Sequence, residues 1–182
     1  MKTIKLLVAV ATVVAALACV GQAQADEIDQ KKLTTDVNEA IAMLKASDSS
    51  MNARFTNAAG YVVFPTAGKG GLVVGGAHGT GQVYEAGKLI GNAKMTQVTV
   101  GAQIGGQAFI EVIFFETKEA LAKFKQADYS FNAQLSAVAA AEGASLNAKY
   151  VDGVMVFTKA KKGVMAEATV GGQKFEFMPL KP

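Results

Sequence analysis

The sequence is poor in the residues from which many catalytic and metal sites are built. Among 182 residues there are one cysteine, one histidine, no tryptophan and three prolines. A site that needs two histidines or two cysteines is therefore excluded, and so is an internal disulfide. The 19 glycines and the hydrophobic content of 51% are typical of an ordered globular protein. We expect a single folded domain without a metal ion or a cofactor.

The first 25 residues have the layout of a secretory signal peptide. Lys2 and Lys5 precede an apolar run over residues 6–18, and the small-x-small triplet Ala23-Gln24-Ala25 follows it. The apolar run has 13 residues, and a membrane-spanning helix needs roughly 20. We expect residues 1–25 to be removed and residues 26–182 to be exported. The mature protein would then be periplasmic, or associated with the outer membrane of a bacterium.

A second cleavage position remains open. Cys19 follows Ala16-Leu17-Ala18, which is similar to a bacterial lipoprotein signal but lacks the leucine usual three residues before the cysteine. Cleavage there would leave Cys19 as a lipid-modified N-terminus. Cleavage after Ala25 would instead leave a mature chain without cysteine, whose fold must depend on its hydrophobic core.

The net charge argues against a nucleic-acid partner. The full chain has 18 basic and 15 acidic residues, and loss of Lys2 and Lys5 leaves 16 basic against 15 acidic residues. A nucleic-acid-binding domain usually carries a strong positive field, which a net charge of this size does not supply.

The mature chain divides into a helical opening over residues 26–59 and a strand-rich part over residues 60–182. In the opening, Leu33, Val37, Ile41 and Leu44 recur at helical spacing. The polar run over residues 47–50 interrupts this pattern, and a second short helix is predicted to end before Gly60.

Glycine and β-branched residues alternate through the middle of the chain. Between Gly60 and Gly106, 13 of 47 residues are glycine. Strands are predicted over residues 61–64 and 71–76, and Gly79-Thr80-Gly81 is interpreted as a tight turn. A hairpin is predicted with its turn at Gly105-Gly106. In its first strand, the side chains that are expected to face the core are Thr96, Val98, Val100, Ala102 and Ile104.

The last third of the chain is predicted to hold one helix and several strands. Thr117 is a candidate N-cap for a short helix with Leu121 and Phe124 on its buried face. A strand is favoured over residues 130–141, and further strands are predicted around residues 154–158, 164–170 and 175–177. Turns are expected at Lys161-Lys162-Gly163 and Gly171-Gly172.

These elements predict an α+β fold. Short connections favour a mostly antiparallel sheet, and the glycines favour strong curvature. We expect a strongly curved, glycine-rich sheet or partly closed barrel, with an N-terminal amphipathic helix and one or two further short helices.

No catalytic residues are assigned from the sequence. His78 has no partner histidine, and we interpret it as a surface or loop residue. Glu111 and Glu116 flank an apolar strand, and we interpret them as solvated glutamates at a sheet edge rather than as an acid–base pair. A hydrolase that uses His78 or Glu111 remains an alternative.

Several cations lie at or near the predicted turns. If these turns share one end of the sheet, they form a cationic rim that could meet anionic lipid headgroups. Ordinary solubilising lysines are the other interpretation. The candidate lipid-binding residues are Lys69, His78, Lys88, Lys94, Lys161 and Lys162.

From Ala59 onward the order of features resembles the SYLF domain family of lipid-binding proteins. The resemblance spans roughly residues 34–177. It rests on Phe64-Pro65, the Gly-x-Gln-x-Gly-Gly-Gln run at 101–107, Lys162-Gly163 and the glycines at 70, 71, 75, 76, 79 and 81. Many members carry a tryptophan-serine pair where this chain has Asn92-Ala93-Lys94. The resemblance implies association with phospholipid membranes and no established enzymatic activity.

The sequence therefore predicts an exported, non-enzymatic protein that binds phospholipid or a membrane surface. In this hypothesis the curved glycine-rich sheet lets lipid atoms approach closely, and the turn lysines neutralise phosphate. The alternative is a periplasmic envelope module for protein–protein interaction or stress, without a lipid site.

Overall fold

The computed structural model describes residues 29–71, 74–126, 129–131, 137–139 and 148–180. The predicted signal peptide and Cys19 lie outside these residues. The chain divides into two compact units, Met1–Thr35 and Asp36–Pro182. Of the first unit the structure describes residues 29–35, which are helical. The second unit contains the sheet.

Two helices precede the sheet, as predicted. The first covers residues 29–47 and buries Val37, Ala40 and Leu44, whose three- and four-residue spacing places them on one face. The second, α2, covers Met51–Asn57. Between them the buried Asp48 carboxylate accepts hydrogen bonds from the backbone N–H and the hydroxyl of Ser50. This Asx-type turn explains why the first helix stops and a second begins.

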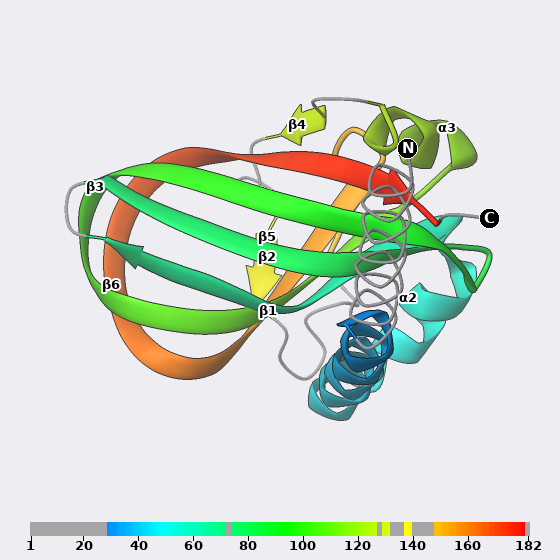
Figure 1. Ribbon diagram of the computed structural model, residues 1–182, viewed down its shortest axis with the longest axis horizontal. Helices are drawn as coiled ribbons and strands as arrows, with labels where there is room; N and C mark the ends of the chain where they lie inside the picture. Colours follow the sequence, from blue (N-terminus) through cyan, green and yellow to red (C-terminus); the bar gives the residue numbers. More distant parts are fainter. Residues whose placement is uncertain (1–28, 72–73, 127–128, 132–136, 140–147, 181–182) are drawn as a thin grey trace, which may run out of the picture. The chain divides into compact units, whose positions relative to one another are not determined.

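The sheet has six strands, whose course Figure 1 shows. Its order is β1-β2-β3-β6-β4, β5 lies beside β6, and β1 also pairs with β3. All of these pairings are antiparallel except the parallel pairing of β5 with β6. The elements in chain order are β1 (Gly60–Gly71), β2 (Val74–Glu85), β3 (Lys88–Phe115), α3 (Lys118–Phe124), β4 (Tyr129–Phe131), β5 (Ala137–Ala139) and β6 (Val154–Pro179).

Two very long strands produce the curvature. The first half of β3 pairs with β2 and its second half pairs with β1, while β1 and β2 also pair with each other. This arrangement requires β3 to bend back over its neighbours. The strand β6 accompanies β3 from Gly91 opposite Pro179 to Phe115 opposite Val154. Figure 1 shows the two strands bending together at the left of the view. The strongly curved α+β sheet predicted from the sequence is confirmed.

The predicted turns inside these strands are wrong. The chain runs through Gly105-Gly106, Lys161-Lys162-Gly163 and Gly171-Gly172 as continuous strand. Gly79-Thr80-Gly81 likewise lies within β2. Bends and a bulge replace the turns: Gly105 adopts a φ of 107°, and the register shifts where Ala108 and Phe109 face Lys162 and Ala160. Glycine and a bulge allow a strand to bend without ending it.

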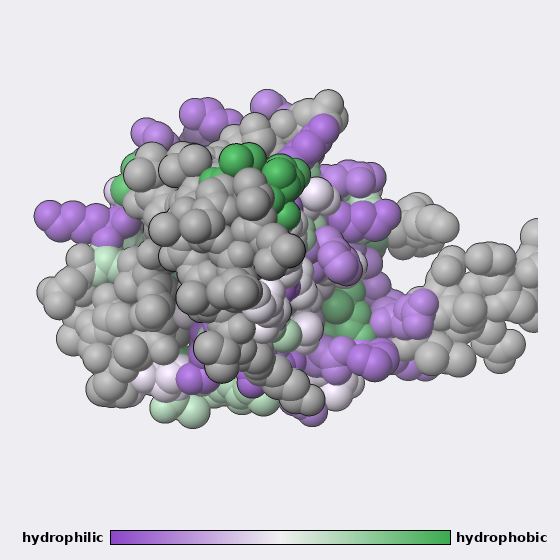
Figure 2. Space-filling view, turned by 90° about the vertical axis from the view of Figure 1, so that its left-hand side faces the viewer, coloured by the Kyte–Doolittle hydropathy of each residue, from purple (hydrophilic) through white to green (hydrophobic). Residues whose placement is uncertain are grey.

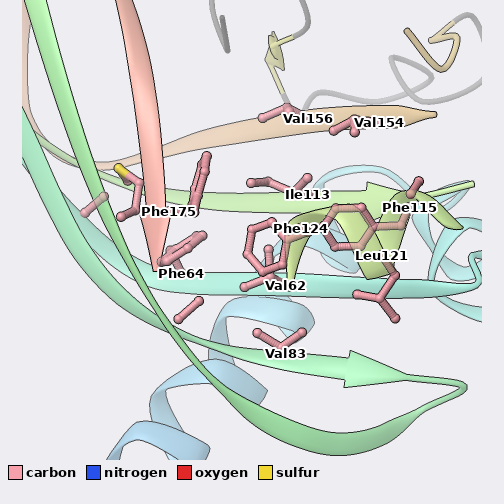
Figure 3. Packing of buried hydrophobic residues seen from close by; sticks show 14 of the residues in the cluster. Val62, Phe64, Val83, Ile113, Phe115, Leu121, Phe124, Val154, Val156 and Phe175 are labelled. Atoms are coloured by element: carbon pink, nitrogen blue, oxygen red, sulfur yellow. The ribbon is translucent and has the colours of Figure 1, made fainter. Parts of the chain in front are cut away.

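A hydrophobic core fills the concave side of the sheet near α3 (Figure 3). Thr117 caps this helix by accepting a hydrogen bond from the Ala120 N–H at 3.2 Å, as predicted. Phe124 packs against Phe115 and Phe175, with ring centroids 5.0 and 5.5 Å apart. On the other side of the sheet Phe55 of α2 meets Tyr61 and Phe114 edge to face, at 5.1 and 4.9 Å. At this end, therefore, both sides of the sheet are covered.

Candidate functional site

The end of the sheet remote from α3 exposes apolar side chains. Val74, Val98 and Val100 are 64%, 56% and 54% exposed. Val74 lies directly opposite Val100 across the β2–β3 pair, and Gly76 lies opposite Val98. Directly opposed residues share one face of a sheet, so the three valines form one cluster. Isolated exposed valines are common, but a cluster of them on adjacent strands indicates a contact surface.

This orientation corrects the expectation for the first half of β3. Val98 and Val100 were expected in the core, yet they are exposed, and the polar Gln97 and Thr99, which alternate with them, are buried. Strand periodicity separates two faces but does not say which face is inside. Here the inner face at this end holds polar side chains that bond to each other, so the apolar face is left outside.

A row of glycines borders the valines. Five residues from four strands lie side by side on the same face of the sheet, and all five are exposed. In order across the strands they are Gly106, Gly70, Gly76, Val98 and Gly172. We call this row, together with Val74 and Val100, the glycine–valine face. Figure 2 looks onto this end of the sheet and shows hydrophobic atoms exposed beside hydrophilic ones. A foreign molecule could approach the backbone here without meeting long side chains.

Packing does not explain all of these glycines. A Cβ on Gly81 or Gly91 would lie 2.4 or 2.5 Å from a backbone oxygen, so the fold requires glycine at both positions. A Cβ on Gly70 or Gly106 would come no closer than 3.8 or 3.7 Å to another atom. That is ordinary van der Waals contact, and larger residues would fit. At Gly70 and Gly106 packing therefore does not require glycine, whereas a Cβ on Gly76 would lie 3.3 Å from the Gln97 carbonyl oxygen, which is a tight contact.

Basic side chains border this face on the side toward α3. His78 lies opposite Thr96, which lies opposite Lys174 on β6, and all three are exposed. Lys94 is also exposed on the same face, one row further away. The structure therefore brings His78 and Lys94 of the predicted set to one border. It adds Lys174, which was not among the candidates predicted from the sequence.

The other candidate lysines do not lie together at turns of the sheet, where the sequence had placed them. Only Lys88 lies beside a turn, at the hairpin between β2 and β3 and at the opposite end of β2 from Val74. Lys69 is half-buried and faces the interior beside Ala77. Lys161 donates hydrogen bonds to the Pro65 carbonyl and the Thr66 hydroxyl, at 3.1 and 2.9 Å. The expected single rim of turn lysines is therefore wrong.

Lys162 lies within β6 opposite Ala108, and not in the turn where it was expected. Whether Lys162 or any other candidate contacts lipid stays a prediction.

One of the two glutamates differs from its interpretation. Glu116 is exposed beyond the end of β3, but Glu111 is 1% exposed and lies in the middle of the sheet. Its Oε2 accepts a hydrogen bond from Gln173 Nε2 at 2.9 Å, and the same nitrogen is 3.4 Å from Gln97 Oε1. Burial raises the pKa of Glu111 to about 7, against smaller lowering effects of the Gln173 hydrogen bond and the positive charge of Lys69.

The described part of the chain holds neither a metal cluster nor a membrane-spanning helix. Its His, Cys, Asp and Glu side chains form no group of three that could hold a metal ion. None of its helices combines the length and the apolar character that a membrane crossing requires.

Comparison with known proteins agrees with the resemblance noted in the sequence. Residues 96–177, from the first half of β3 to the end of β6, match the family model Ysc84, described as Las17-binding protein actin regulator. The chain is also 29% identical over 145 residues to Beta cell expansion factor A of Aeromonas veronii. That alignment covers 79% of this chain and 55% of the relative, so the chain spans about half of the relative's length. Both findings confirm the resemblance to the SYLF (Ysc84) domain family, whose model matches residues 96–177 of this chain.

Proposed function

We propose that this protein is exported, is not an enzyme, and binds phospholipid membranes through the glycine–valine face. The observation that carries the proposal is the exposure of Val74, Val98 and Val100 together, beside Gly70 and Gly106, where packing does not require glycine. The SYLF family is associated with lipid binding and actin regulation, which supports the same conclusion. Export rests on the secretory layout of residues 1–25.

The face suits a shallow contact with a bilayer. Burying a valine side chain fully is worth roughly 1.5–3 kcal/mol, so three partly exposed valines supply only a few kcal/mol. Each lysine near an anionic surface adds about 1 kcal/mol. Lys174 and Lys94 lie on the same face as Val98, two and four positions along the sheet from it, so they would be close to anionic headgroups if the valines touched a bilayer. Apolar contact and charge would therefore act together.

Vesicle flotation tests the proposal. We expect the protein to float with vesicles of phosphatidylglycerol and phosphatidylethanolamine, and the double variant V98S/V100S to lose most of this binding. The matched control is V151S, because Val151 is 48% exposed but lies outside the glycine–valine face. Equal flotation of V98S/V100S and the parent protein, at unchanged folding, would rule out this face as the lipid site.

A protein partner is the second candidate function. The matching family is described as Las17-binding, and the flat exposed face of this chain could equally receive a protein surface. In this alternative the protein is an envelope interaction module without a lipid site. Absence of flotation with every vesicle composition, for a folded and lipid-free chain, would favour it.

A further inference from the structure

A buried polar cluster lies on the inner side of the sheet, behind the glycine–valine face. Its members are Gln97 from the first half of β3, Glu111 from the second half and Gln173 from β6, which are 5%, 1% and 3% exposed. Hydrogen bonds from a single nitrogen, Gln173 Nε2, reach both of the other side chains. The cluster thus connects the two halves of the strand that bends back on itself.

The hydrogen bonds of this cluster are incomplete. Glu111 Oε1 and Gln173 Oε1 are both buried, and neither has a hydrogen-bond partner within the part of the chain that the structure describes. Both atoms are acceptors when Glu111 is ionised, so neither can satisfy the other. A buried acceptor without a donor is costly, and a buried carboxylate charge costs more.

One added proton removes both defects. A proton on Glu111 Oε1 turns this oxygen into a hydrogen-bond donor. The acceptor that lacks a donor is Gln173 Oε1, which belongs to the same amide group that already donates to Glu111 Oε2. The carboxylic acid and the amide then form two antiparallel hydrogen bonds, in which each group donates once and accepts once. We propose that Glu111 and Gln173 form a proton-dependent latch between β3 and β6, closed when Glu111 is neutral.

The surroundings of Glu111 favour the neutral form. Its cross-strand neighbours are Phe64 on β1 and Thr158 on β6, and neither carries a charge. From α3 the buried side chains are Ala120, Leu121 and Phe124, which are apolar. Lys69 on β1 is the charged group that acts on Glu111, and its effect on the pKa of Glu111 is smaller than that of burial.

The latch predicts how stability depends on pH. The pKa of Glu111 rises from 4.5 to about 7 on folding, so the folded state holds more protons than the unfolded state between these values. The stabilisation is complete below pH 4.5, falls as the pH rises toward 7, and is lost above it. The folding equilibrium constant should fall across this window by on the order of a hundredfold through Glu111 alone.

A direct test is the titration of the carboxyl carbons by NMR in the isolated protein labelled with ¹³C-glutamate. One glutamate should titrate near pH 7, and this signal should be missing from the variant E111Q. If no glutamate titrates above about pH 6, Glu111 is ionised in the folded protein and the latch does not exist. This readout needs only the parent protein if E111Q does not fold.

Denaturant unfolding between pH 4.5 and 7.5 gives the second readout. The variant E111Q is the mimic of the closed latch, because an amide at position 111 can donate to Gln173 Oε1 at every pH. Its stability should lack the fall that the parent shows. The control E116Q removes an exposed glutamate and should keep the parent's profile. An E111Q profile parallel to that of the parent would overturn the proposal, which does not depend on lipid binding.

Discussion

Gln97 and Val98 are consecutive residues of β3 that lie in opposite environments, the polar side chain buried and the apolar one exposed. The same inversion continues at Thr99 and Val100. It has a physical basis on each side of the strand. Gln97 is 3.4 Å from Gln173 inside, and Val98 lies in a row of glycines outside. One strand therefore contributes to both the inner polar cluster and the glycine–valine face.

The glycines should separate into two classes when each is replaced by alanine. G81A should destabilise the protein by about 1–3 kcal/mol or more, because the new Cβ would lie 2.4 Å from the Val63 carbonyl oxygen. G68A should leave stability unchanged or raise it by up to about 1 kcal/mol, since a Cβ there would meet no atom within 4 Å. Urea unfolding measures both effects. Equal losses would show that the sheet requires glycine at both positions.

A charged side chain on the flat face should reduce membrane binding without unfolding the protein. G106E places a long carboxylate among exposed glycines, where a Cβ would meet nothing closer than 3.7 Å. We expect flotation with anionic vesicles to fall at least tenfold, and thermal unfolding to stay close to that of the parent. The control G106Q has a similar size without the charge and should lose less. Unchanged binding of G106E would exclude this row from the contact.

The cations at the border should matter more than those elsewhere. K94Q should weaken binding to anionic vesicles by about fivefold, which corresponds to about 1 kcal/mol for one lysine at the surface. K88Q is the matched control, because Lys88 is also exposed but lies at the opposite end of β2 from the valines. The difference should shrink at high salt, where exposed charges are screened. Similar losses for both variants would indicate a diffuse attraction instead.

The core under α3 should be sensitive to truncation. F124A should cost about 3–5 kcal/mol, since Phe124 is fully buried between Phe115 and Phe175. F55A should cost less, because Phe55 is only half-buried on the other side of the sheet. Urea unfolding of the two variants checks the order. A smaller loss for F124A would mean that α3 contributes little to the core.

Local patterns were sufficient to predict the helices before and after the long strands and the curvature of the sheet. The spacing of Val37 and Leu44 indicated the first helix, the hydroxyl of Thr117 indicated the start of α3, and glycines among β-branched residues indicated a curved sheet. Each of these inferences concerns residues that are close in the sequence. The structure confirms them because the local preference and the tertiary packing agree.

The residues of the candidate site could not be predicted from strand periodicity alone. Alternation around Val98 separates two faces, but only the partners of Gln97 on a distant strand decide which face is inside. Gly105-Gly106 permits either a turn or a bend, and the long pairing with β6 selects the bend. Glu111 looked like an edge residue because its neighbours on β1 and β6 are 47 residues away in the sequence in each direction. A polar residue within an otherwise apolar strand was the available signal.

The pairing of β3 with β6 also determines how the protein can fold. Gly91 and Pro179 are 88 positions apart, and the separation between paired residues falls along the ladder to 39 positions between Phe115 and Val154. Such a high contact order makes folding slow, because a long loop must close before the pairing compensates for its entropy. Until β6 arrives, one edge of β3 has open backbone N–H and C=O groups that can pair with another chain. Early folding intermediates should therefore be prone to aggregation, and a holdase that shields this edge should raise the yield of native protein.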